Sequence, residues 1–124
     1  MILKSTRVKI SDNSGGKIAE TIKITGKYAT IGDVIVVSIK DAIPGKIGSR
    51  GFFLKKGEVH YGVVIRTKKE IIRPDGTLRS FNDNAITIIK ENGQPLATRI
   101  FGPVTHELRK NHIKLLALTN ERIK

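Results

Sequence analysis

The stretch from Arg66 to Phe81, RTKKEIIRPDGTLRSF, predicts a β-ribbon that carries a strong excess of positive charge. Its centre, PDG (74–76), favours a turn because proline fixes one φ angle, aspartate bonds its own backbone and glycine accepts positive φ. The arms hold a single acid, Glu70, against five cations: Arg66, Lys68, Lys69, Arg73 and Arg79. An isolated two-stranded ribbon is marginal in water, and like charges along it oppose pairing. We therefore expect the ribbon to lie against an anionic partner.

Positive charge extends from the ribbon into the preceding loop. The 124-residue chain has a formal net charge of +12. Eight cations against two acids, a net of +6, fall between Pro44 and Arg73: Lys46, Arg50, Lys55, Lys56, Arg66, Lys68, Lys69 and Arg73. Folding does not require such an excess, because self-repulsion opposes compaction. The loop and the ribbon are therefore predicted to form one basic surface for a polyanion, with nucleic acid as the first candidate.

Several functional classes lack support in the residues. The chain has no cysteine, which excludes disulfides, thiolate nucleophiles and cysteine-ligated metals. Its three histidines share no metal-ligand spacing, and its aspartates lie in or beside turn sequences. No run is long or apolar enough to span a bilayer, and the N-terminus lacks the pattern of a signal peptide. We expect no catalytic site, no metal, no cofactor and no membrane contact.

Short runs rich in β-branched residues, separated by turn residues, dominate the chain. This pattern is typical of an all-β barrel or sandwich. The runs are STRVKIS (5–11), KIAETIKITG (17–26), DVIVVSIKDAI (33–43), EVHYGVVIRTKKEII (58–72) and NAITIIK (84–90). ENGQ (91–94) predicts a hairpin turn, VTHELRKN (104–111) a helix, and PGKIGSRGFFLKKG (44–57) a long exposed loop.

Three short motifs have two interpretations each. DNSGG (12–16) is either a loop in which Asn13 and two glycines approach a phosphate, or an Asx turn between strands. In TRIFGP (98–103), Arg99 is either solvated or part of a protein or RNA contact. Phe52-Phe53 either wedges against a partner or folds back onto the core. The aromatic residues form no stacking strand, which favours folded RNA over stripped single strands.

Taken in order, five segments resemble the ribosomal large-subunit protein L-fourteen family, of bacterial or organellar type. The segments are DNSG, GD-IVVSIK-AIP, KKGEV, GVVIRTKKE--RPDGT--F-DNA and G-P--TRIFGPV--ELR, and the match around them runs from about Arg7 to Leu118. The resemblance implies a mainly β fold: a five-stranded OB-like barrel with a projecting ribbon and small C-terminal helices. It implies one domain over 1–124, with the barrel at about 1–102, the ribbon at about 66–81 and the helical region at about 103–124.

The resemblance also implies a function without catalysis. Members of the family are structural constituents of the large ribosomal subunit that bind its rRNA directly. They contact small-subunit rRNA in an intersubunit bridge and neighbour ribosomal proteins of the L-three and L-nineteen families. A ribosome-silencing factor docks on a family surface that corresponds here to Thr98, Arg99 and Lys114. A further polar position of that surface is Ala117 here, which departs from the family pattern.

Together these observations predict one set of rRNA-binding residues and one cellular compartment. The set is Lys46, Arg50, Lys55, Lys56, Arg66, Lys68, Lys69, Arg73, Arg79 and Asn13. The 46–54 loop is longer than in typical bacterial and plastid members of the family. This length and the preference for Ile over Val and Lys over Arg favour an organelle-encoded mitochondrial ribosome. The bacterial cytoplasm is the alternative setting. The alternative functions are a free OB-type RNA-binding translation or assembly factor, and an adaptor whose main surface faces protein.

Overall fold

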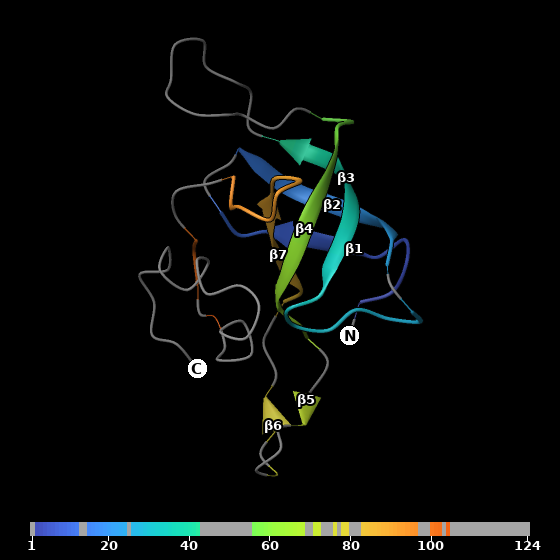
Figure 1. Ribbon diagram of the computed structural model, residues 1–124, viewed down its shortest axis with the longest axis vertical. Coiled ribbons are helices and arrows are strands. Elements are labelled where there is room, and N and C mark those ends of the chain that lie inside the picture. Colours follow the sequence, from blue (N-terminus) through green and yellow to red (C-terminus); the bar gives the residue numbers. More distant parts are fainter. Residues whose placement is uncertain are drawn as a thin grey trace.

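Seven β-strands are formed by the residues that the computed structural model describes. These residues are 2–12, 15–24, 26–42, 56–68, 71–72, 76, 78–79, 83–96, 100–102 and 104. Five of the strands close into a barrel in the order β1 (Arg7–Ile10), β2 (Gly16–Lys23), β3 (Val34–Ala42), β4 (Val59–Arg66) and β7 (Ala85–Ile89). The predicted five-stranded barrel is confirmed (Figure 1).

The barrel closes through its only parallel strand pair among the described residues, β1 with β7. Lys9 lies opposite Ala85 and Ile10 opposite Ile86, whereas the other neighbouring strands are antiparallel. Closure removes the exposed strand edges that would otherwise pair with other chains. The closing ladder is short, so contacts beyond the backbone are needed to hold β1 against β7.

β3 lines the core through the alternation of its side chains, whereas β7 is buried throughout. In β3, Ile35, Val37 and Ile39 are buried while the residues between them are partly exposed, as the two-residue period of a strand requires. All five residues of β7 are buried, which means that both of its faces are covered. Isoleucine and valine supply all ten of the largest fully buried side chains. Branching at Cβ suits these residues to a pleated, packed surface.

The segment after β7 returns along the barrel. A turn at 90–94 is closed by the Gly93 amide donating to the Lys90 carbonyl at 2.9 Å, which confirms the predicted turn at ENGQ. The Leu96 amide then donates to the Ile88 carbonyl at 3.1 Å, and the Phe101 amide to the Ser11 carbonyl at 2.8 Å. Ile100 joins the hydrophobic core by this path.

A two-stranded ribbon projects from one end of the barrel. It consists of β5 (Ile71–Ile72) and β6 (Leu78–Arg79), with Ile71 opposite Arg79 and Ile72 opposite Leu78. Figure 1 shows the ribbon beyond the ends of β4 and β7, as the sequence predicts. The predicted C-terminal helices and the predicted 44–57 loop, apart from its last residues, lie outside the described residues. Within the described ranges, no helix has the length and hydropathy needed to cross a membrane.

Candidate nucleic-acid interface

Arg66, at the end of β4, fastens the base of the ribbon to the barrel. Its Nε donates to Asp83 Oδ1 at 3.0 Å, its Nη1 to the Phe101 carbonyl at 3.0 Å, and its Nη2 to Ser11 Oγ at 2.6 Å. Only 5% of the residue is exposed. A planar guanidinium can bind three acceptors in different directions, which a lysine ammonium at this position would match poorly. Arg66, predicted as a phosphate ligand, therefore joins four segments of the protein.

Gly102 makes room for this guanidinium. Its φ angle is +83°, and a Cβ placed on it would collide with Nη1 and Cζ of Arg66. Glycine is the residue that adopts positive φ without strain and allows close approach of other atoms. The FG part (101–102) of TRIFGP therefore has a structural purpose, since Phe101 offers its carbonyl and Gly102 offers space.

Asp12 holds the two closing strands together from inside the protein. Its Oδ2 accepts from Thr87 Oγ1 at 2.8 Å and from the Ile88 amide at 2.9 Å, and the residue is 5% exposed. The aspartate of DNSGG thus points at β7 and strengthens the short β1–β7 ladder. Asn13, the predicted phosphate donor in the same motif, lies outside the described residues.

Lys68 stands two residues beyond Arg66 and is exposed. Its backbone amide donates to Asn84 Oδ1 at 2.7 Å, which ties the outgoing arm of the ribbon to the residue just before β7. Asp83, next to Asn84, binds Arg66 and lies 4.0 Å from Lys9 Nζ. Both arms of the ribbon are therefore fixed at their base while the side chain of Lys68 stays available.

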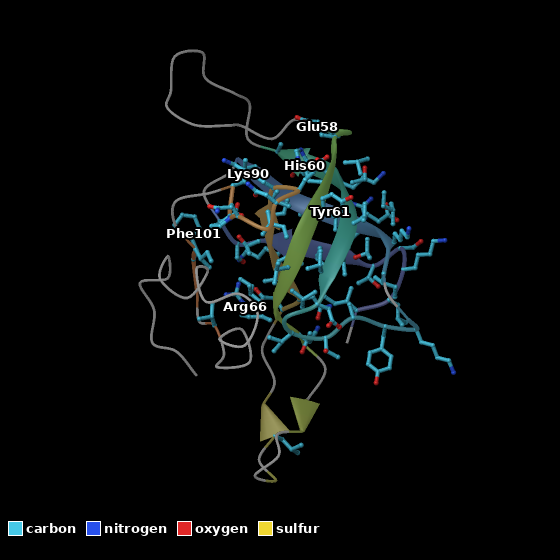
Figure 2. All side chains as sticks on the ribbon, in the orientation of Figure 1. Glu58, His60, Tyr61, Arg66, Lys90 and Phe101 are labelled. Atoms are coloured by element: carbon cyan, nitrogen blue, oxygen red, sulfur yellow. The ribbon has the colours of Figure 1, made fainter. Side chains whose placement is uncertain are left out.

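Lys56 is also exposed, but it belongs to the opposite end of the barrel. It precedes β4, whereas Lys68 follows that strand, and Figure 2 shows Glu58 and Arg66 at the two ends. An eight-residue strand separates its ends by roughly 25 Å. The structure therefore does not bring Lys56 and Lys68 together into one basic surface, because the intervening strand crosses the whole barrel.

His60, near the start of β4, has a local acidic partner. Its Nε2 is 3.1 Å from Glu58 Oε2, with both side chains partly exposed (Figure 2). Among the described residues, no three histidine, aspartate or glutamate side chains gather closely enough to hold a metal ion. The His60–Glu58 pair is a contact between a residue of β4 and the residue that directly precedes this strand.

The remaining predicted site residues are not placed. For Arg79 only the backbone pairing is described. The other members of the predicted sets lie outside the described residues: Lys46, Arg50, Lys55, Lys69, Arg73, Thr98, Arg99 and Lys114. Their roles stay predictions.

Sequence reasoning missed the partners of Arg66. Asp83 and Ser11 read as turn and strand-end residues, and they lie 17 and 55 positions from Arg66 along the chain. One weak sequence signal for these partners is the arginine that ends an otherwise apolar strand, GVVIR (62–66). A cation at such a position must either point into solvent or bind acceptors inside the protein.

A comparison with known protein families adds the deciding observation. The family model described as Ribosomal protein L14p/L23e matches residues 1–123. The chain belongs to this family. The family resemblance predicted from the sequence is thereby confirmed. Membership makes the chain a structural constituent of the ribosome, associated with the large subunit and its rRNA, in a family not known for catalysis.

Proposed function

We propose that the chain binds large-subunit rRNA directly, through cations of the ribbon presented on a rigid base. The observation that carries the proposal is the fixed ribbon base. Arg66 and Asn84 hold the two arms against the barrel. Lys68, Lys69, Arg73 and Arg79 follow on those arms.

Phosphate contacts supply affinity and orientation, whereas little sequence information passes through them. A cation on a flexible arm loses conformational freedom when it binds, and this cost is lower when the backbone is already ordered. A ribbon with a fixed base therefore suits recognition of the shape of folded rRNA.

The proposal includes a second contact region at the other end of β4. Lys56 is exposed there, and Lys46, Arg50 and Lys55 precede it in the chain. Exposed cations beyond the two ends of β4, which lie roughly 25 Å apart, suit a protein that contacts two separate RNA segments. We propose large-subunit rRNA and small-subunit rRNA, across an intersubunit bridge, as those segments.

Protein partners and compartment complete the proposal. Ribosomal proteins of the L-three and L-nineteen families are the proposed neighbours, and Thr98, Arg99 and Lys114 are the proposed contact for a silencing factor. The proposed ribosome is mitochondrial, with a bacterial ribosome as the alternative, and the preference for Ile and Lys supports the former.

The test compares two triple variants in the whole chain. Lys69→Ala, Arg73→Ala and Arg79→Ala remove ribbon cations, whereas Lys4→Ala, Lys23→Ala and Lys27→Ala remove the same charge from exposed positions outside the ribbon. Sucrose gradients of cell lysate at low and high salt then report sedimentation with large subunits. The ribbon variant is expected to leave the subunit at lower salt than the control variant.

Equal salt resistance of the two variants contradicts rRNA binding by the ribbon. Release of the unaltered chain to light fractions at moderate salt means that it is a free RNA-binding factor, which contradicts a constituent role.

A further inference from the structure

A groove of about 740 Å³ crosses the outside of β1. Arg7 and Lys9 are exposed along it, while Val8 and Ile10, which alternate with them, are buried in the core. Lys17 of β2 and Lys68 at the ribbon base add two more cations. The three cations on β1 and β2 do not belong to the rRNA-binding set predicted from the sequence. They are spread through short strands and form no run that a charge count along the chain would detect.

Two acids also line the groove, and both are bound to donors. Oδ2 of Asp12 faces inward and accepts from Thr87 and Ile88. Asp83 accepts from Arg66 at 3.0 Å and lies 4.0 Å from Lys9. The lining therefore keeps a net positive charge, with its cations more exposed than its acids.

An aromatic ring completes the groove. Phe101 is 50% exposed at its edge, on a backbone fixed by the carbonyl bond to Arg66. Ile18, opposite Lys9 across the β1–β2 ladder, contributes an apolar wall. Surfaces that bind unpaired RNA combine cations that track the backbone with aromatic rings on which bases stack. The volume lies within the range of about 300–1,000 Å³ of small-molecule pockets, which suits a few nucleotides rather than a duplex.

We propose that this groove binds an unpaired strand of rRNA, with phosphates on Arg7, Lys9 and Lys17 and one base stacked on Phe101. The inference rests on the proposed function, because it takes rRNA as the polyanion that the chain binds. It adds a surface on β1 and β2, which continues from the ribbon through Lys68. It also adds base stacking to a recognition mode otherwise limited to phosphates and shape.

The charge test uses two variants of the purified full-length chain with matched charge. Arg7→Gln, Lys9→Gln and Lys17→Gln alter the groove, whereas Lys4→Gln, Lys23→Gln and Lys27→Gln alter exposed positions outside its lining. Filter binding to protein-free large-subunit rRNA gives affinity as a function of salt. Because the groove variant can no longer neutralise three phosphates of a single strand, its slope of log affinity against log salt is expected to fall in magnitude by about 2. The control variant is expected to change the slope far less.

The stacking test uses Phe101→Ala against Tyr28→Ala. Tyr28 is also half-exposed, at 45%, and does not line the groove. Removal of the ring on which one base stacks is expected to weaken rRNA binding by about fivefold or more, without a change in the salt slope. Phe101→Trp should retain affinity, since tryptophan offers a larger stacking surface.

Two results overturn the groove proposal while leaving the proposed function intact. One is equal behaviour of groove and control variants while removal of the ribbon cations still lowers affinity. The other is normal rRNA affinity of the groove variants together with loss of a neighbouring protein from assembled subunits, which means that a protein occupies the groove. Unchanged affinity in groove, ribbon and control variants alike overturns both proposals.

Discussion

Arg66 and Lys68 stand two residues apart at the end of β4, carry the same charge and serve different purposes. Arg66 is buried and donates to three acceptors within the protein, whereas Lys68 is exposed at the start of the ribbon. Counting cations along the sequence treats them as equal. The difference teaches that a basic segment of an RNA-binding protein contains both cations that build the scaffold and cations that the scaffold presents.

The largest expected effect is that of Arg66→Ala. The variant leaves Ser11 Oγ, the Phe101 carbonyl and Asp83 without their shared donor. Removing one member of a buried charged network typically costs about 3–5 kcal/mol, and the partial exposure of Asp83 places the loss at about 3 kcal/mol. Urea denaturation followed by circular dichroism measures it.

Arg66→Lys is the sharper form of this test. It keeps the charge but cannot reach three separate acceptors, so we expect it to recover less than half of the lost stability. Full recovery would mean that charge alone matters at this position, and the contrast with Lys68 would fail.

Asp12→Ala is expected to rank second, at about 2 kcal/mol. The substitution leaves the Thr87 hydroxyl and the Ile88 amide without the carboxylate that they bind, close to the short β1–β7 ladder. Asp41→Ala, at an exposed position in β3, is the matched control and should be near neutral. Comparable denaturation midpoints for the two variants would contradict the anchoring role of Asp12.

Gly102→Ala tests whether the Arg66 guanidinium needs the space that the missing Cβ of Gly102 leaves. Gly93 has nearly the same φ, +84° against +83°, but an added Cβ there meets nothing within 4 Å. Gly93→Ala should therefore cost only the backbone strain of about 1 kcal/mol, whereas Gly102→Ala should cost about 2 kcal/mol because the guanidinium must move. Thermal denaturation of both variants decides this, and equal losses would show that the guanidinium shifts freely.

The fold was largely predictable because its signals are local. The β-branched runs at 33–43 and 84–90 became β3 and β7, and the PDG sequence predicted the bend of the ribbon. Strand order was not contained in those patterns. The family resemblance implied a five-stranded barrel but no strand order, and the parallel pairing of β1 with β7 joins residues more than seventy positions apart.

The candidate site was less predictable because exposure is a tertiary property. GVVIR (62–66) does not reveal that Arg66 turns toward Ser11, and RVKI (7–10) does not reveal that Arg7 and Lys9 border a groove. Two positive charges in one strand and a third in the next form a cluster only after the strands have paired. A charge count along the chain detects runs such as TKK (67–69) and misses clusters of that kind.

Thr21→Val is expected to raise the stability of the protein, by less than the substitutions at Arg66, Asp12 and Gly102 lower it. The hydroxyl of Thr21 is buried and has no hydrogen-bond partner among the described residues, so replacing it with a methyl of similar size should stabilise the protein by about 1 kcal/mol. Thr87→Val is the contrasting variant, because that hydroxyl donates to Asp12 and its removal should destabilise. A lower denaturation midpoint for Thr21→Val would mean that the hydroxyl does find a partner in solution.

Lys68→Ala is expected to change stability least and completes the comparison with Arg66. The Lys68 bond to Asn84 uses the backbone amide, which alanine retains, so the denaturation curve should be unchanged. The side chain borders both the ribbon and the groove over β1, so affinity for large-subunit rRNA should fall, with a salt slope smaller in magnitude by about 0.7. The Arg66 substitution is then detected by a loss of stability, and the Lys68 substitution by a loss of RNA affinity at unchanged stability, although the two residues carry the same charge. A stable Lys68→Ala variant with unaltered rRNA affinity would remove Lys68 from the interface and leave the Arg66 anchor in place.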